Sequence, residues 1–558
     1  PAYVKAAKNL ETLWLDSRLT QNHQKSIVAL SRRMVAKGYK PAMPHFEQFF
    51  SGVNAAFNGT YANPAEVDNY LTVATQVVET YDTKSALKYF ETARNLFENR
   101  LVYNSNFNRL FALEGTFSFR FIDAAADAAK TADPAKPAAA NDGWGNVTAD
   151  STGLLSSATA YEKKPLPTVA GAVIEFKNVN LVMLTASDSV PVTQTNGQLA
   201  IKEGVWLGKG GKLTWEMAGT PDIYVVFGGY SFNIGLPKII ADDAKLHYTS
   251  KLSQPVDGLF EYESKRRNKG QYSPYPRFVS YRNDAQLKGL SKNIQYKGGL
   301  SLVGLKFSSN SLSQEPSTII VNNGNKVAFK SSSRRFEFAD SVITSPLASF
   351  STYLGDKDSL YHPAIRLSYN DAEGLVKVQK AERTGYQNTA YADSYHKMYI
   401  DAEMLRWSFV KNEIEFSVIA GKNVVPVRFE SFSFFKSERF RAMGEQYGFH
   451  PLLMAANYIA KQKTPTFFPE DVAAFYKRDP GALRTAFSQL NADGYLTIEP
   501  KTGLYRMSSK GLLYVLANNK QTDFDNFQVS SLYPANATTA NASIDLKDNV
   551  MTIRGVDK

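Results

Sequence analysis

The sequence predicts an α+β multidomain protein with an N-terminal α-helical domain, a long antiparallel β-rich region and a small helical domain near the C-terminus. Three observations predict this class. Apolar residues recur with a helical period before residue 123, alternate with polar residues between 168 and 436, and return to the helical period after 437. A chain of 558 residues is also too long for one hydrophobic core, so several domains are expected.

Residues 1–123 are expected to form a helical domain. Its clearest apolar stripe has i, i+3, i+4, i+7, i+11 spacing and consists of Phe46, Phe49, Phe50, Val53 and Phe57. Asn63-Pro64 has the pattern of an N-cap followed by proline at the first helical position. Such stripes must pack against each other, which predicts a helical bundle. A ligand-binding groove between its helices is the alternative use of these faces.

Residues 124–167 are expected to form a low-complexity linker or loop. The segment is rich in Ala, Asp, Ser, Thr and Pro and has few large apolar side chains. It can therefore bury little surface to offset the entropy lost on ordering.

Residues 168–436 are expected to be β-rich. Phe260 and Tyr262 alternate with glutamates, and so do Ile414 and Phe416, which is the period of a strand with one wet face. The dipeptide Asp-Ala recurs beside strand-like runs at residues 243, 284, 371 and 401. These gaps are too uneven for a solenoid. They favour an irregular layered or curved sheet.

Helical patterns return in residues 437–517. Asp479-Pro480 is a second pattern of N-cap followed by proline, and Gly494 stands where a helix exit requires a left-handed residue. Two helices followed by a two-stranded hairpin resemble a winged-helix domain over residues 465–517. In a winged-helix DNA reader the second helix enters the major groove, but such domains also serve as protein–protein modules. A residue pattern typical of strands returns in residues 518–558, which are expected to start a further β segment.

The chain contains no cysteine. This excludes thiol nucleophiles, Cys-ligated zinc, iron–sulfur clusters and disulfides. The six histidines are scattered without metal-ligand spacing, so no catalytic residue, metal site or cofactor is predicted. Avoidance of cysteine suits a chain that enters an oxidising compartment. The start at Pro1, without an initiator Met, predicts a processed or truncated chain.

Charge and hydropathy bear on the partners. The net charge of +11 and the pI near 9.2 favour acidic glycans or lipid headgroups as neighbours. The excess is spread thinly along the chain, so nucleic acid is not expected as a partner. No stretch has the roughly 18 to 20 apolar residues of a transmembrane helix.

One segment combines cations and aromatic residues in a way that suits binding. Its candidate binding residues are Lys265, Arg266, Arg267, Lys269, Tyr272, Tyr275 and Arg277. The cations can hold phosphates or an acidic glycan while the rings stack on flat ligand faces. The alternative is a solvated loop between strands.

Two carboxylate pairs are candidates for catalytic groups, because two carboxylates suffice for glycoside hydrolysis. They are Glu261 with Glu263 and Glu413 with Glu415. Each pair lies on one side of a strand whose other side is apolar, so both pairs are expected to face water.

The tracts Tyr275-Pro276-Arg277-Phe278 and Gly298-Gly299-Leu300-Ser301-Leu302-Val303-Gly304 give the chain a resemblance to large uncharacterised envelope or surface proteins of Gram-negative bacteria. The sequence pattern of the predicted strands also resembles that of β-layered proteins that move lipopolysaccharide. The resemblance implies export to the periplasm, outer membrane or cell surface, with other envelope proteins as partners. The sequence therefore predicts a non-enzymatic scaffold or binding protein that uses an extended β surface. The alternatives are a glycan-active hydrolase and a lipid- or lipopolysaccharide-handling protein.

Overall fold

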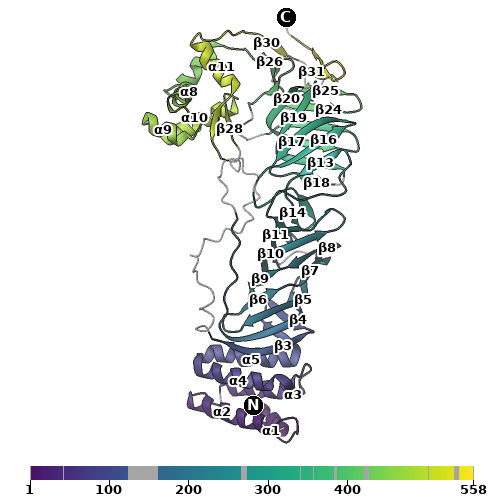
Figure 1. Ribbon diagram of the computed structural model, residues 1–558, viewed down its shortest axis with the longest axis vertical. Coiled ribbons are helices and arrows are strands. Elements are labelled where there is room, and N and C mark those ends of the chain that lie inside the picture. The colour runs from purple at the N-terminus through teal and green to yellow at the C-terminus, as the bar shows by residue number, and fades with distance from the viewer. Residues whose placement is uncertain are drawn as a thin grey trace. The chain divides into compact units, whose positions relative to one another are not determined.

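The computed structural model (Figure 1) describes residues 2–41, 43–123, 161–265, 273–313, 315–339, 341–355, 357–381, 386, 388–419, 426–499, 502–532 and 539–556. They divide into two compact units. Unit 1 falls within Pro1–Ala140, Glu162–Tyr281 and Leu302–Lys306, and unit 2 within Asn141–Tyr161, Arg282–Ser301 and Phe307–Lys558. The predicted linker lies outside the described residues as far as residue 160, and the segment from 161 to 170 has no regular secondary structure. The α+β class with extensive antiparallel pairing is confirmed.

Unit 1 begins with amphipathic helices that stack in layers (Figure 1). They are α1 (Ala2–Trp14), α2 (Gln21–Ala36), α3 (Pro44–Asn58), the 3-10 turn η1 (Pro64–Glu66), α4 (Val67–Thr80) and α5 (Thr83–Asn99). Local capping starts two of them, because Thr20 accepts a hydrogen bond from the backbone of His23 and Asp82 from that of Ser85. α1 packs on α3 and α2 on α4, while α3 packs on α5.

The helices of unit 1 share their core with its first strands. Tyr70 and Tyr89 stack with ring centroids 5.8 Å apart, and the ring of Phe119 on β3 (Thr116–Ile122) lies 5.5 Å from that of Tyr70. All three side chains are at most 2% exposed. Because these aromatic rings interlock, the helical layer and the first strands form one packed body.

The prediction that residues 1–123 are helical throughout is wrong after Asn99. The chain exits α5 through Arg100 in the left-handed conformation and continues as β1 (Leu101–Asn104), β2 (Asn108–Leu113) and β3. The physical reason is visible in β3, where Phe117 and Phe119 are buried and alternate with more exposed residues. This period of two suits a strand that pairs with β4 (Gly171–Thr185).

The other strands of unit 1 extend this antiparallel sheet. They are β5 (Ser189–Ala200), β6 (Val205–Lys209), β7 (Lys212–Trp215), β8 (Thr220–Phe227), β9 (Gly229–Asn233), β10 (Lys238–Tyr248), β11 (Val256–Glu263) and β12 (Arg277–Ser280), with the turn η2 (Glu216–Ala218). β4 is long enough to pair with β3 through its first half and with β2 through its second. The register of β4 against β5 shifts around Asn178, which has a φ of 51°. The short strand β14 (Ser301–Val303) lies at the division between the units.

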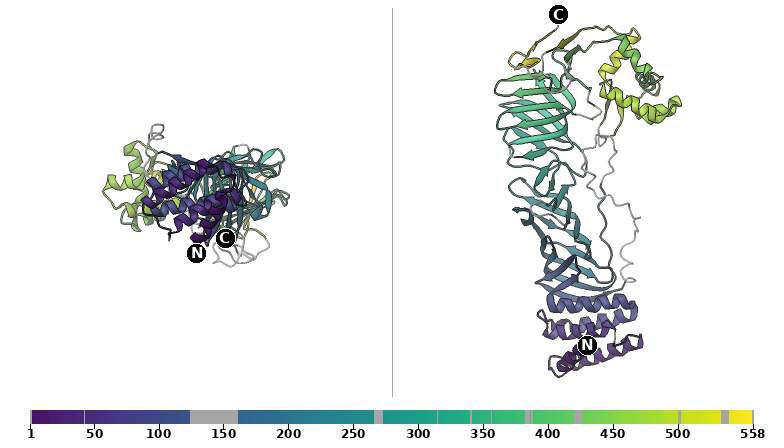
Figure 2. Two further views of the ribbon diagram at one scale, coloured as in Figure 1. Left: turned by 90° about the horizontal axis from the view of Figure 1, so that it is seen from below. Right: turned by 180° about the vertical axis from the view of Figure 1, so that it is seen from behind.

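Unit 2 contains strands that lie side by side in both views of the ribbon (Figures 1 and 2). They are β13 (Ile294–Lys297), β15 (Lys306–Ser308), β16 (Ser317–Asn323), β17 (Lys326–Ser333), β18 (Glu337–Ala339), β19 (Val342–Leu354), β20 (Asp358–Asn370), β21 (Leu375–Lys380), β22 (Tyr391–Asp393), β23 (Met398–Asp401), β24 (Met404–Ser408), β25 (Glu413–Ser417) and β26 (Val427–Ser431).

Strands β19 and β20 belong to two layers at once. The start of β20 pairs with β22 and its end with β21, while β19 pairs with β18 through its start and with β17 through its end. The two layers enclose a common core. Phe329 on β17 contacts Trp407 on β24, and Tyr391 on β22 contacts Phe416 on β25. The irregular layered sheet expected from the sequence is thus a two-layer arrangement joined by bent strands.

A helical module follows β26. Its elements are α7 (Ser437–Glu445), α8 (Pro451–Gln462), β27 (Thr466–Phe467), α9 (Pro469–Tyr476), α10 (Pro480–Ala492), β28 (Leu496–Ile498), β29 (Tyr505–Met507) and α11 (Ser509–Asn518). The three strands form a separate small sheet in the order β27, β29, β28. Asp479 caps α10, Pro480 is its first residue and Gly494 has a φ of 80°, so these local predictions are confirmed.

The C-terminal strands return to the layers of unit 2. β30 (Gln528–Ser531) pairs with β26, and β31 (Ala542–Asp545) pairs with β25 and with β32 (Val550–Ile553). The sequence predicts the start of a further β segment here. The strands exist, but they complete sheets that the chain left before the helical module.

Candidate functional site

The structure describes three of the seven predicted binding residues, and they lie together. The guanidinium carbon of Arg277 lies 4.4 Å from the ring centroid of Tyr275, and the Nζ of Lys265 lies 5.7 Å from it. Arg266, Arg267, Lys269 and Tyr272 lie outside the described residues. The ring of Tyr275 is engaged by these cations, and the residue is 3% exposed. In this structure the ring is therefore not an open stacking platform.

The cations beside Tyr275 are matched by two glutamates of β11. Lys238 lies 2.7 Å from Glu261 and 3.8 Å from Glu263, whereas Lys265 lies 3.6 Å from Glu263 and Arg277 3.9 Å from Glu261. The Tyr275 hydroxyl donates to Glu263 at 3.0 Å. Burial and the charge of Glu261 raise the pKa of Tyr275, which keeps this donor protonated.

The expectation that Glu261 faces water is wrong. Glu261 is 4% exposed, and its carboxylate is contacted by its cross-strand neighbour Arg277 on β12 and by Lys238 on β10, which lies diagonally across from it. Three cations around two carboxylates leave a small positive excess, so an anionic ligand would compete with the glutamates. Binding of phosphate or glycan by the predicted segment stays a prediction.

The second carboxylate pair follows the predicted alternation more closely. Ile414 and Phe416 of β25 are buried, whereas Glu413 and Glu415 are partly exposed. Glu415 lies 3.6 Å from Arg406 on the neighbouring strand. This is the cross-strand charge pair of a wet sheet face.

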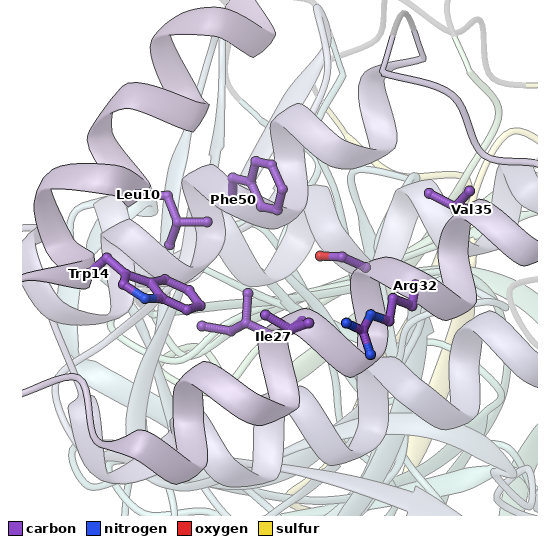
Figure 3. Close-up of a pocket in the computed structure, with 8 residues that line it drawn as sticks. Leu10, Trp14, Ile27, Arg32, Val35 and Phe50 are labelled. Atoms are coloured by element: carbon purple, nitrogen blue, oxygen red, sulfur yellow. The ribbon is translucent and has the colours of Figure 1, made fainter.

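An open apolar groove lies between α1 and α2. It is lined by Leu10 and Trp14 of α1, Ile27, Val28, Ser31, Arg32 and Val35 of α2, and Phe50 of α3, and it encloses about 440 Å³. Figure 3 shows the side chains of Leu10, Trp14, Ile27 and Phe50 around this space, with Arg32 and Val35 farther along α2. A second hollow of about 410 Å³ shares Leu10, Trp14 and Phe50 and extends to Ala7, Glu11 and Leu15.

The rims of this groove expose large apolar side chains. Leu15 is 89% exposed, Val35 61% and Val28 39%. The sequence stripe of α2 that carries Val28 and Val35 also carries Lys25 and Arg32, at i, i+3, i+7 and i+10. On the side of α1, the second hollow is lined by Glu11 and Trp14, and by Leu15 just beyond the helix. Both rims therefore combine apolar and charged side chains.

The helices around the groove are strongly basic. Residues 2–40 contain eight Lys or Arg residues and two acidic residues. Arg18 pairs with Asp16, and Arg33 and Lys37 share Glu79. Lys8, Lys25 and Arg32 are exposed and have no ion-pair partner among the described residues. A groove between the N-terminal helices is one alternative that the sequence predicts, but the local concentration of charge beside it is not among the predictions.

The outer face of the unit 1 sheet presents a second accessible surface. Tyr224 on β8 stacks on His247 on β10 with centroids 4.5 Å apart, and the Nζ of Lys212 on β7 lies 4.0 Å from the Tyr224 ring centroid. Burial lowers the pKa of His247, and the charges of Lys245 and Lys212 lower it further. The imidazole is therefore neutral near pH 7. Leu213, Val225 and Leu246 fill the opposite face.

Metal and membrane sites were also sought. Within the part of the chain that the structure describes, no group of three His, Asp or Glu side chains could hold a metal ion. None of the described helices is long and apolar enough to cross a membrane.

Comparisons with known proteins give no family for this chain. No protein-family model, no curated protein and no solved structure matches it.

Proposed function

We propose that this protein is a non-enzymatic scaffold or binding protein. The observation that carries the proposal is the open groove between α1 and α2, which leaves Val28, Val35 and Leu15 in contact with water. Contiguous exposed apolar surface costs free energy in the isolated chain and is typical of interaction sites. Burying about 100 Å² of it would contribute roughly 2.5 kcal/mol to an association.

The extended β surface predicted from the sequence is the second part of this proposal. On the outer face of unit 1, Lys212, Val226 and Lys245 occupy one cross-strand row, and Thr214, Tyr224 and His247 occupy the next. A stacked Tyr–His pair under a lysine offers aromatic area and hydrogen-bonding groups on rigid strands. Such a surface suits a partner protein or an acidic glycan.

We propose that the helical module of unit 2 is a winged-helix-like domain that makes protein contacts. The order of helices and strands and the small sheet β27–β29–β28 support this assignment. Arg484, on the helix that would read DNA, pairs with Glu470 at 2.5 Å. The end of that helix is already used within the unit, because Thr389 donates to the Ala492 carbonyl at 2.9 Å. Both features weaken a nucleic-acid role.

We propose the bacterial cell envelope as the location, with other envelope proteins as partners. The absence of cysteine from 558 residues supports this location. The alternatives of a glycan hydrolase and a lipid or lipopolysaccharide carrier stay predictions.

Site-specific photo-crosslinking in the native cells tests the scaffold proposal. A photoreactive residue at Val35 reports on the groove and one at Val226 on the outer β face, while Val550, which is 53% exposed on β32, serves as the control. We expect one stoichiometric protein crosslink from Val35 or Val226 that is absent from Val550. Equal diffuse labelling at all three positions would contradict the proposal.

A further inference from the structure

We propose that the groove between α1 and α2 receives an amphipathic helix of a partner protein whose polar face is acidic. This inference rests on the proposed binding function and names the chemistry of the partner.

The shape of the groove suits a helix. α1 packs on α3 and α2 on α4, so both helices are supported from the same side. The amide of Gln24 donates to the carbonyl of Trp14 at 3.1 Å and ties the two helices near the loop that joins them. The groove has a mainly apolar lining, which includes Leu10, Trp14, Ile27, Val28, Val35 and Phe50. Such a trough accepts anchors at i, i+3, i+4 and i+7 of a docked helix.

The charges around the groove select the polar face of that helix. Lys25 and Arg32 alternate with Val28 and Val35 along the exposed stripe of α2. On the side of α1, Glu11 lines the second hollow together with Leu15, which lies just beyond the helix. The lining and the exposed stripe of α2 thus place two cations, Lys25 and Arg32, and one carboxylate, Glu11, beside the apolar surface. A helix that fills the trough must pass these cations, so acidic residues flanking its apolar anchors complement them.

The same charges disfavour two other occupants. A second copy of this chain bound through the same face would oppose Lys25 and Arg32 with identical cations. An anionic bilayer would complement the cations, but a bilayer is nearly flat on this scale. Leu10, Ile27 and Phe50 are recessed, with Leu10 7% and Ile27 2% exposed, and an acyl surface would not fill the concavity between the helices.

Three fluorescent peptides tested on the full chain decide the matter. All three carry the same apolar face at helical spacing, and their polar faces are Glu-rich, Gln-rich or Lys-rich. We expect the Glu-rich peptide to bind at least about tenfold more tightly than the Gln-rich one, and more tightly still than the Lys-rich one. Its affinity should fall as salt rises from 50 to about 300 mM, because exposed charges are screened.

Matched variants locate the site. Val35→Asp should weaken binding of the Glu-rich peptide by about tenfold or more through the apolar contact, and the double variant Lys25→Glu with Arg32→Glu should do so through charge. Lys330→Glu, which changes an exposed and unpaired cation of unit 2, and Val327→Asp, which changes a valine 42% exposed on β17, should leave affinity unchanged. The substituted residues are exposed, so each variant is expected to fold. Circular dichroism verifies this.

Each outcome distinguishes the partner chemistry from the scaffold proposal. Equal binding of all three peptides, or no binding while Val35 still crosslinks to a protein in cells, overturns the acidic helix and leaves the scaffold proposal standing. Binding to vesicles of anionic phospholipid that Val35→Asp abolishes overturns it in favour of a membrane. Absence of both peptide binding and specific crosslinks at Val35 and Val226 removes the inference and the proposed function together.

Discussion

His396 joins two turns of unit 2 through both of its ring nitrogens. Nδ1 lies 2.7 Å from the carboxylate of Asp393, which is fully buried, and Nε2 lies 2.8 Å from the carbonyl oxygen of Asn549. Two acceptors favour the doubly protonated ring. Burial lowers the pKa of His396, but the hydrogen bond and charge of Asp393 and the Asn549 carbonyl outweigh it, so the pKa is raised.

This geometry predicts a pH dependence of stability. A raised folded-state pKa contributes stability that is fully present below the unfolded value, about 6.5, and is lost as pH rises through the folded value. The free energy of unfolding of the native protein should therefore fall as pH rises above 6.5, and His396→Gln should remove that decline. Urea unfolding from pH 5.5 to 8.5 measures it. His247→Gln is the control and should leave the decline in place.

Glu261 should matter for stability because it is the buried member of a charge cluster. Glu261→Ala leaves Lys238 and Arg277 without their closest carboxylate, so we expect a loss of about 2 kcal/mol, reduced from the cost of a fully buried pair because both cations are partly exposed. Glu413→Ala, at a partly exposed position, should cost less than about 0.5 kcal/mol. Chemical denaturation compares the two variants, and equal losses would contradict this account.

At the scale of elements, local signals were the most readable. Asp479-Pro480 and Gly494 fixed both ends of α10 because caps depend on neighbours along the chain. Period-two patterns likewise identified β25 through Ile414 and Phe416. The strands after Asn99 were not predicted, because the helical pattern that precedes them was assumed to continue beyond the end of α5. Their pairing partner β4 lies beyond residue 170, which no local pattern reveals.

The helix α10 gives a prediction at this scale. The Asp479 carboxylate accepts a hydrogen bond from the Ala482 backbone at 2.7 Å. Asp479→Ala should therefore destabilise the helical module by about 1 kcal/mol, whereas Asp479→Asn retains a capping oxygen and should cost a few tenths of that. Hydrogen exchange of amides in α10 measures the difference. Equal protection in the two variants would show that packing, not the cap, limits opening of this helix.

The candidate sites depend on contacts between residues that are distant along the chain, and local sequence patterns do not reveal such contacts. The sequence correctly placed Tyr275 and Arg277 in one patch, since they are close along the chain. It could not foresee that Lys238, on another strand, would neutralise Glu261. The groove depends on α1 and α2 being held apart on a common support, and helical periodicity reports only which face of each helix is buried. The excess of cations in residues 2–40 was readable from the sequence and marks the surface where the groove opens.

At the scale of the whole molecule, basic charge is unevenly distributed along the chain. Residues 2–40 carry a net charge of +6, more than half of the total of +11. The first two helices of unit 1 should therefore attract acidic partners at long range, and this attraction weakens with salt. Some of the remaining charges are paired across neighbouring strands, as at Glu415 with Arg406.

The position of the helical module between β26 and β30 has a consequence for folding. Glu430 on β26 pairs directly with Gln528 on β30, so the two ends of the module emerge side by side. During synthesis, β26 cannot pair with β30 until the whole helical module between them has been made. A module that has already folded presents its two ends together and spares the chain most of the entropy of closing so long a loop. The pairing of the last strands of unit 2 is thereby coupled to the prior folding of its inserted helices.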